Sequence, residues 1–361
     1  MRSQNPPKTA ALLLILCIAV LVFLAACGGG SSSSGSTLAS GSGGQSGSGG
    51  GSSGGSSGSG GDGSGGGTGG SGGGGGTGAG GGTGGGGAVI PPMQHVAIVV
   101  LENSDYDDIV GSPSAPYINS LIAQGGLAAN YYADVHPSIG NYFVMTTGVA
   151  YSVDDNFSGV VPIDNVVREL TAASKSWKVY AQSLPSQGYL GGDAYPYLRR
   201  HNPISYFSDV QPPAQLNMNI VDFSQLAADL SSGQLPAYIF IVPDAEHDAH
   251  DCPGGGSGCD IGTRVAAADN WLAANLPQLL SNAAFQQSGV LVLTTDESRN
   301  DDTHGGGRVA TVLVGSHVKA GYIGNVQYDH RSLLGLSMTA LGVSTIPNGA
   351  GSANQMTEFF Q

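Results

Sequence analysis

The sequence predicts an α/β domain with a mostly parallel sheet that is flanked by helices on both faces. Three short runs of apolar, largely β-branched residues, at 96–101, 238–242 and 290–295, lack the alternation of a half-exposed strand. Such runs are typical of strands that are buried on both faces. Segments with the apolar spacing of helices lie between them, and strands that alternate with helices favour a parallel sheet.

The individual elements follow from these runs and from the residues that end them. Gly125 and Gly126 stop a helix, and Pro137 forces His136 to be extended, so that the next helix begins at or near Ser138. A long segment rich in Tyr, Pro and Gly is irregular and receives no assignment. The expected order is strand 95–102, helix 113–125, helix 139–147, helix 163–175, strand 177–181, irregular segment 182–213, helix 222–230, strand 238–242, helix 263–280, strand 290–295, loop 301–307, strand 309–315 and helix 332–341.

Residues 1–26 are predicted to be an export signal, because two basic residues precede an uncharged apolar stretch. The sequence Leu-Ala-Ala-Cys that ends at Cys27 resembles the bacterial lipobox, so we expect cleavage before Cys27 and lipidation of its sulfur. An ordinary signal peptide or an uncleaved anchor is the alternative, and either would also place the domain outside the cytoplasm. Gly28 does not resemble an inner-membrane retention signal, which favours an anchor in the outer membrane or at the cell surface.

Residues 27–87 are expected to form the lipidated cysteine and a disordered tether. Of the 60 residues after Cys27, 35 are Gly and 16 are Ser, with a single charge and no aromatic side chain, so this segment cannot bury a core. A Gly-rich coil of this length has a root-mean-square reach of roughly 40 Å. The remaining residues, 88–361, are predicted to be one catalytic domain.

The composition narrows the range of expected partners, and the predicted export determines the expected state of the cysteines. Without Arg2 and Lys8 the chain has ten basic residues against 26 acidic ones, so nucleic acid is not expected as a partner. A phosphate substrate would need a local cation to draw it in. In an exported protein Cys252 and Cys259 are expected to form a disulfide, with a thiolate metal site as the alternative.

Polar clusters follow each of the three apolar runs. Glu102 and Asn103 end the first run, Asp296 and Glu297 end the third, and the cluster after the second is Asp244, Glu246, His247, Asp248, His250 and Asp251. In open α/β sheets ligands bind beyond the carboxyl ends of the strands, so the clusters should meet at one edge. Crowded carboxylates repel one another unless a cation or shared protons relieve them, and the histidines among them indicate a metal.

Ser138 is a candidate anion-binding residue because it lies at or near a helix N-terminus. Unpaired backbone N–H groups and the helix dipole favour an anion beside its hydroxyl there. A plain N-cap serine is the alternative interpretation. His136, two residues before it, is expected to orient the serine loop rather than to react.

These residues together resemble the phosphoesterase family of bacterial acid phosphatases and phospholipases C, a branch of the alkaline phosphatase superfamily. The motifs that carry the resemblance occur in the family's order along nearly the whole domain. They are Val99–Asn103 with Tyr106-Asp107-Asp108, His136-Pro137-Ser138 with Asn141-Tyr142, Val242-Pro243-Asp244 with His247-Asp248 and His250-Asp251, Thr295-Asp296-Glu297, and Tyr328-Asp329-His330.

The resemblance implies an alkaline phosphatase-like fold and a role for each site residue. Glu102, Asp296 and Glu297 would hold a divalent metal ion with the Ser138 hydroxyl, which would attack phosphorus and form a phosphoserine. Asn103 would donate to a phosphoryl oxygen. The histidines expected to contact phosphate, protonate the leaving oxygen or hold a second metal are His247, His250 and His330, and the candidates for supporting or second-metal positions are Asp244, Asp248 and His304.

Departures from the superfamily pattern limit these roles. Asp296-Glu297 replaces the Asp-His of two-zinc members, and the extra carboxylate favours a harder cation, so one metal ion is expected rather than two. Ser138 lacks the downstream Pro and Arg of sulfatases, which disfavours sulfatase activity. The chain is also shorter than the phospholipases C of the family, so a compact phosphatase matches better.

The sequence therefore predicts a metal-dependent phosphomonoesterase that acts through Ser138. A phospholipase C or another phosphodiesterase is the alternative within the enzyme class, and the predicted membrane anchor would suit either. The expected substrate is a small phosphate ester or a phospholipid head group. The alternative from another class is a non-catalytic surface module that binds metal or a glycan.

Overall fold

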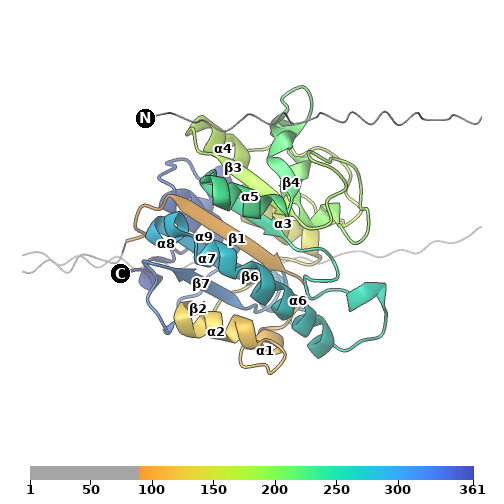
Figure 1. The fold of residues 1–361 in the computed structure, drawn as a ribbon, viewed down its shortest axis with the longest axis vertical. Coiled ribbons are helices and arrows are strands. Elements are labelled where there is room, and N and C mark those ends of the chain that lie inside the picture. The colour runs from red at the N-terminus through yellow and green to blue at the C-terminus, as the bar shows by residue number, and fades with distance from the viewer. Residues whose placement is uncertain (1–88) are drawn as a thin grey trace, which may run out of the picture. The chain divides into compact units, whose positions relative to one another are not determined.

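The computed structural model describes residues 89–361 (Figure 1). The predicted signal peptide, the lipidation of Cys27 and the tether lie outside the described residues. Within them, no helix combines the length and the apolar character that crossing a bilayer would require.

Eight strands form one sheet in the order β4-β3-β5-β1-β6-β7-β2-β8. Their bounds are β1 His95–Leu101, β2 Gly126–Ala128, β3 Trp177–Ala181, β4 Ile220–Asp222, β5 Tyr238–Val242, β6 Gly289–Thr295, β7 Thr311–Gly315 and β8 Tyr322–Gly324. Neighbours pair in parallel except at β7, which runs antiparallel to both β6 and β2. The predicted mostly parallel sheet is confirmed.

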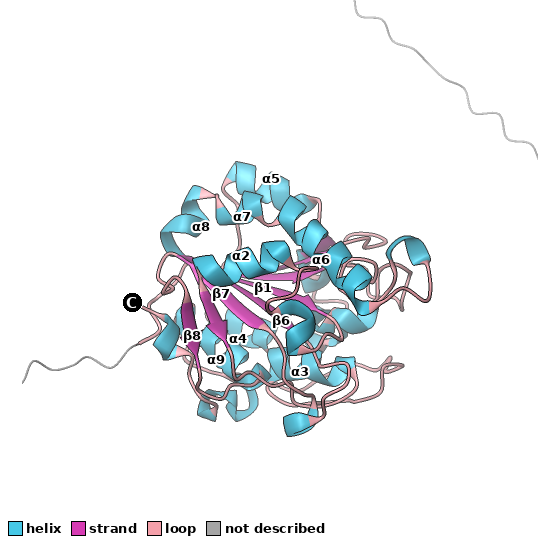
Figure 2. Ribbon diagram, turned by 90° about the horizontal axis from the view of Figure 1, so that it is seen from below, coloured by secondary structure: helices cyan, strands magenta, loops and turns pink. Residues whose placement is uncertain are grey.

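Helices cover both faces of this sheet, as the view along its edge shows (Figure 2). The α-helices are α1 Tyr106–Ile109, α2 Pro116–Gln124, α3 Ser138–Thr147, α4 Val166–Ala172, α5 Gln225–Ser232, α6 Ile261–Asn275, α7 Pro277–Leu280, α8 Ala283–Ser288 and α9 His330–Ala340. Alternate residues of β1 enter two separate cores. Ile98 packs on the side of α3, α4 and α9, whereas Val99 packs on the side of α2 and α5–α8. Both faces are apolar, which explains the continuous apolar strands.

The structure differs from the sequence expectations mainly at the short elements. Pro277 has no N–H to continue a helix, and the single helix expected at 263–280 is α6 followed by α7. Three-residue strands β2, β4 and β8 and the short helix α8 were not predicted. Asp222, the first residue of the helix expected at 222–230, instead ends β4, and α5 begins at Gln225.

The segment 182–213 contains no long helix or strand. It folds into three short 3₁₀ turns, Arg199–His201, Pro203–Tyr206 and Ser208–Val210, whose apolar side chains are buried on the α3 side of the sheet. This segment therefore packs as part of the core, although its backbone is irregular.

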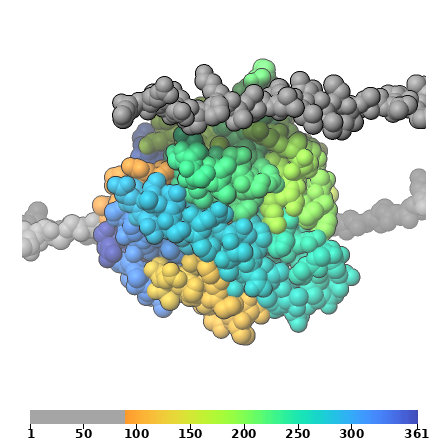
Figure 3. Space-filling model, viewed as in Figure 1, coloured from red at the N-terminus to blue at the C-terminus, as the bar shows by residue number. Residues whose placement is uncertain are grey.

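The predicted disulfide between Cys252 and Cys259 is confirmed. It closes a Gly-rich loop that follows the cluster after β5. In Figure 3 this part of the chain forms the teal projection at one corner of the molecule.

Candidate active site

The carboxyl ends of β1, β5 and β6 lie side by side because β1 pairs with β5 on one side and β6 on the other. Leu101 is in register with Thr295, and the Asp296 N–H donates to the Leu101 carbonyl at 2.9 Å. The Glu102 N–H donates to the Asp248 carbonyl at 2.6 Å. The three predicted clusters therefore meet at one edge of the sheet.

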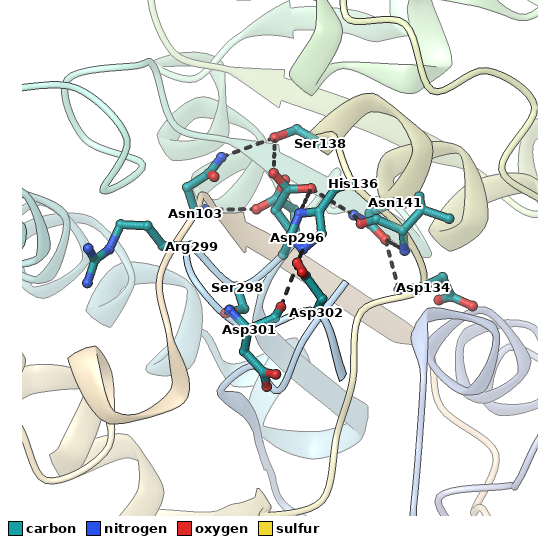
Figure 4. A network of polar contacts seen from close by, with 12 residues as sticks. Asn103, Asp134, His136, Ser138, Asn141, Asp296, Ser298, Arg299, Asp301 and Asp302 are labelled. Atoms are coloured by element: carbon teal, nitrogen blue, oxygen red, sulfur yellow. Dashed lines mark hydrogen bonds and ion pairs between the residues drawn. The ribbon is translucent and has the colours of Figure 1, made fainter. Parts of the chain in front are cut away.

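Ser138 opens helix α3, and its hydroxyl faces this edge (Figure 4). Ser138 Oγ lies 3.0 Å from Glu102 Oε2 and 3.4 Å from Glu297 Oε1, and the Asn103 amide donates to it at 3.1 Å. The first turn of α3 approaches the adjoining loop so closely that a Cβ on Gly140 would lie 2.5 Å from Val135 Cγ2. Glycine at this position lets the helix reach the site.

Asn103 and Asp296 are tied to each other at the ends of adjacent strands. Asn103 has a φ of 44°, and its backbone N–H donates to Asp296 Oδ1 at 3.0 Å. Its side-chain amide also donates to Glu102 Oε2 at 2.9 Å. Asn103 therefore holds Glu102 and Ser138 through one amide group.

Two residues around Ser138 fix the position of Glu297. The Asn141 amide donates to Glu297 Oε2 at 3.3 Å and to the Val135 carbonyl at 2.7 Å. His136 Nδ1 lies 3.1 Å from the same carboxylate oxygen. The expected orienting role of His136 agrees with this contact.

His201 is a site residue that the sequence did not indicate. Its ring is fully buried, with Nε2 3.1 Å from Glu102 Oε1 and Nδ1 3.1 Å from Asp248 Oδ2. Tyr142 of α3 stacks on it, with the ring centroids 5.4 Å apart. A lone histidine in an irregular segment carries no signal of this role, because its partners are 99 and 47 positions away in the chain.

Burial and mutual repulsion raise the pKa values of two carboxylates. Burial, and then the charges of Glu102 and Glu297, raise the pKa of Asp296 well above its usual value. Burial and the charge of Glu102 raise the pKa of Glu297 to about 8. Glu297 therefore holds a proton at neutral pH unless a cation replaces it, and the same causes favour the protonated form of Asp296.

The Glu102–His201 pair behaves in the opposite way. Burial alone would raise the pKa of Glu102, but the charges of His201 and His250 lower it below the usual value. Burial disfavours the His201 cation, yet Glu102 and Asp248 raise its pKa. Glu102 is therefore an anion that faces a buried imidazolium.

His250 and His247 have different partners in the loop after β5. The His250 backbone N–H donates at 2.9 Å to Asp248 Oδ1, whose other oxygen faces His201, and His250 Nδ1 lies 2.7 Å from Asp251 Oδ1. His247 Nδ1 instead lies 2.7 Å from Asp244 Oδ1, and this hydrogen bond raises the pKa of His247. The structure thus brings His250 to the Glu102 side and pairs His247 with Asp244.

His330 and His304 lie outside the group that contacts Ser138. His330 is fully buried behind Asp296, with Nε2 2.6 Å from the Asp296 carbonyl and Nδ1 3.1 Å from the Tyr131 hydroxyl. Burial lowers the pKa of His330, so it holds the strand end as a neutral ring. His304 is exposed, and its ring packs edge-on against Tyr132.

These oxygen donors suit a hard cation, although the side chains are not arranged as a complete coordination shell. Among the described residues, no three His, Cys, Asp or Glu side chains are already arranged to hold a metal ion. Asp296 Oδ2 is buried and has no hydrogen-bond partner within residues 89–361, and it belongs to a carboxylate whose pKa is raised by burial and by its acidic neighbours. Oxygen donors with these properties fit a divalent ion such as Mg²⁺, Mn²⁺ or Ca²⁺.

The model of the Phosphoesterase family matches residues 112–343 of this chain. The chain belongs to that family. Membership confirms the enzyme class expected from the sequence, a hydrolase of phosphoric esters.

Curated relatives agree with this assignment. The chain is 34% identical over 238 residues to the phosphatidylinositol-3-phosphatase of Mycobacterium tuberculosis, which covers 65% of this chain and 72% of the relative. It is 31% identical to a probable acid phosphatase of Kluyveromyces lactis over 66% of this chain. It is also 31% identical to the phosphate-repressible acid phosphatase of Penicillium chrysogenum over 65% of this chain. The chain spans about half the length of these two fungal relatives, 55% in each case.

Solved structures confirm the alkaline phosphatase-like fold. An alkaline phosphatase superfamily protein from Vibrio parahaemolyticus superposes with a TM-score of 0.51 at 12% identity, over 72% of this chain and 69% of its own. The lipoteichoic acid synthase LtaP from Listeria monocytogenes gives a TM-score of 0.50 at 13% identity, over 74% of this chain and 77% of its own. At such low identity these matches establish the fold alone.

Proposed function

We propose that the protein is a metal-dependent phosphomonoesterase in which Ser138 attacks phosphorus and carries the phosphoryl group. The observation that carries this proposal is the Ser138 hydroxyl at the start of buried helix α3, within 3.4 Å of carboxylates that follow two different strands. A serine that only capped the helix would not need acidic partners from β1 and β6. Acid phosphatases among the relatives support a monoester as the substrate.

Glu102 is the group best placed to accept the Ser138 proton. Its Oε2 is 3.0 Å from Ser138 Oγ, and the charge of the neighbouring His201 lowers the pKa of Glu102, which favours its ionised form. As the oxygen becomes a nucleophile, the N-terminal end of α3 stabilises the negative charge that develops beside it. The Asn103 amide, already 3.1 Å from Ser138 Oγ, is in position to donate to a phosphoryl oxygen.

Glu102, Asp296 and Glu297, with Ser138, are the residues that would hold the metal ion. When bound, a divalent ion there would lower the pKa of the serine hydroxyl and neutralise charge on the phosphoryl oxygens. The raised pKa values of Asp296 and Glu297, which burial and neighbouring acids cause, support a cation in this place. Asn141 and His136 keep Glu297 aimed at Ser138.

His250 is the proposed general acid for the leaving oxygen. It lies in the loop after β5, where its backbone N–H donates to Asp248 Oδ1 at 2.9 Å, and its ring is partly exposed to water. Asp251 orients the ring through Nδ1. Water would then attack the phosphoserine with His250 acting as the base, the Oγ–P bond would break, and Glu102 would return its proton to the departing Ser138 oxygen.

The proposal also includes a class of substrate and a location for the enzyme. The mycobacterial relative acts on a phosphoinositide according to its name, so a phosphorylated lipid head group is a proposed substrate alongside small esters. The disulfide between Cys252 and Cys259 supports export, because disulfides persist in oxidising compartments. We therefore retain the lipid-anchored location as part of the proposal.

Replacing Ser138 with Ala tests the proposed role directly. Hydrolysis of p-nitrophenyl phosphate by Ser138→Ala should fall to background, whereas the exposed serine variant Ser186→Ala should retain full activity. Circular dichroism would verify that both variants fold. Unchanged turnover by folded Ser138→Ala would remove Ser138 from its role.

A further inference from the structure

A cavity of about 190 Å³ lies on the α3 side of the molecule, next to the site but apart from its carboxylates. The lining residues that matter are Asp155, Asn156, Ser158, Asp193, Arg199 and Tyr206, and we call this space the leaving-group pocket. Its two walls come from the loop after α3 and from the irregular segment that carries His201. Both segments lie beside α3 (Figure 1).

Two contacts connect the leaving-group pocket to the reacting residues. Asp155 Oδ1 accepts a hydrogen bond at 3.3 Å from the backbone N–H of Ile139, the residue that follows Ser138. Arg199 belongs to the same 3₁₀ turn as His201, whose ring touches Glu102. One wall of the pocket is therefore anchored next to the nucleophile and the other next to its proton acceptor.

Arg199 is a buried cation without a partner of opposite charge. It is only 9% exposed, its guanidinium lies 4.0 Å from the centre of the Tyr206 ring, and it forms no ion pair within the described part of the chain. Nε and Nη2 donate to Ser205 at 3.1 Å each, to its hydroxyl and its carbonyl. Nη1 makes no hydrogen bond to residues 89–361 and remains for a ligand.

The acids that share the pocket do not neutralise this charge. Arg200 forms an ion pair with Asp193, which also accepts from the Arg199 backbone N–H at 2.7 Å. Asp155 uses one carboxylate oxygen on Ile139. The pocket, which Arg199 lines, thus offers an anion one guanidinium nitrogen that has no partner among the described residues, and offers alcohols carboxylate, amide and hydroxyl groups.

We propose that the leaving-group pocket binds a second anionic group on the leaving alcohol of the substrate, with Arg199 as its ligand. The inference rests on the proposed function and adds a substrate class: phosphate monoesters of a polyol that carries a phosphodiester. A buried guanidinium binds phosphate oxygens through charge-assisted hydrogen bonds. In so acidic a protein, Arg199 would also supply the local attraction that a polyanion requires.

The test compares two substrates that share the phosphate to be removed. Dibutanoyl phosphatidylinositol 3-phosphate carries the phosphodiester, and myo-inositol 3-phosphate lacks it. For the full chain, the ratio of kcat/KM on the first to kcat/KM on the second should exceed one. Arg199→Met should lower this ratio by roughly 10- to 100-fold, the usual effect of a charged hydrogen bond, and Arg199→Lys should restore part of it.

An arginine outside the pocket provides the matched control. Arg168→Met removes an equal charge that is paired with Asp209, and because neither residue lines the pocket the ratio should stay unchanged. Ser158→Trp fills the pocket from an exposed position and should lower the ratio even if Arg199→Met fails to fold.

The outcomes separate this inference from the proposed function. If the wild-type chain hydrolyses both esters but neither Arg199→Met nor Ser158→Trp changes the ratio, the pocket is not a leaving-group site. Equal losses in Arg199→Met and Arg168→Met would also overturn the inference. Failure of the wild-type chain to hydrolyse either ester or an aryl phosphate would overturn the proposed function, and the inference with it.

Discussion

Raising the pH should destabilise the metal-free protein, because Glu297 is protonated in the folded state over a range in which the unfolded chain ionises it. Burial, followed by the charge of Glu102, raises the pKa of Glu297 from 4.5 to about 8. Between these values the folded protein binds the proton that the unfolded chain releases. The free energy of unfolding therefore falls as the pH rises, and this contribution is fully present only below the unfolded pKa.

The size of the effect follows from the two pKa values. At about 1.4 kcal/mol for each pH unit, the interval corresponds to a loss of about 5 kcal/mol. For a domain of this size that is a fall in Tm of about 10–20 °C. The Glu297 side chain is only 5% exposed, so solvent screening reduces the figure little.

The assay is thermal unfolding of chelator-treated protein at a series of pH values from about 4.5 to about 8. Asp296, whose pKa is raised by burial and by its acidic neighbours, and His201, whose ion pairs outweigh its burial, add slopes of the same sign, so the comparison must isolate Glu297. Glu297→Gln cannot ionise and should show a much flatter curve, whereas the exposed Asp107→Asn should follow the wild type. Parallel curves for wild type and Glu297→Gln would refute the reasoning. A bound divalent ion should also flatten the wild-type curve, because it binds the ionised carboxylate.

Three further predictions concern the surroundings of Ser138. His201→Phe leaves Glu102 and Asp248 buried without their shared partner, so the free energy of unfolding measured in urea should fall by about 3–5 kcal/mol. His304→Phe, at an exposed position, should show no such loss. Equal stability of the two variants would contradict the buried pairing. Gly140→Ala places a Cβ 2.5 Å from Val135 Cγ2, which should cost about 1–3 kcal/mol and reduce kcat on p-nitrophenyl phosphate. Gly256→Ala, where the nearest atom to the added carbon is the Pro253 carbonyl oxygen at 3.5 Å, is the control. An unchanged kcat in Gly140→Ala would show that the close approach does not position Ser138. Finally, chelation should abolish hydrolysis, and a single equivalent of divalent ion should restore it; full activity of protein shown by elemental analysis to be metal-free would exclude the metal from the mechanism.

The sequence predicted the part of the site that strand ends supply. The runs before Glu102 and Asp296 are buried on both faces, so their pattern identified two strands, and parallel order alone required their ends to meet. Ser138 could be placed because Pro137 prevents the helix from starting earlier. These inferences depend only on local backbone preferences and on a general property of parallel sheets.

His201 could not be predicted in this way. It lies in a segment without periodicity, and its place beside Glu102 depends on how the 3₁₀ turns pack against α3. The same limit applies to His330. Its position before the last predicted helix marked it as a candidate, but its ring points toward the Asp296 carbonyl. Strands of three residues, such as β8, are formed by pairing with a neighbour rather than by their own sequence.

The most direct test of the central claim is to identify the residue that carries the phosphoryl group during turnover. The protein would be mixed with substrate, quenched in acid within the first turnover, digested and examined by mass spectrometry. A phosphoryl group on Ser138, absent in Glu102→Gln, is the predicted result. Full turnover with no phosphoryl group on Ser138 at any quench time, or with one on another residue, would contradict the account.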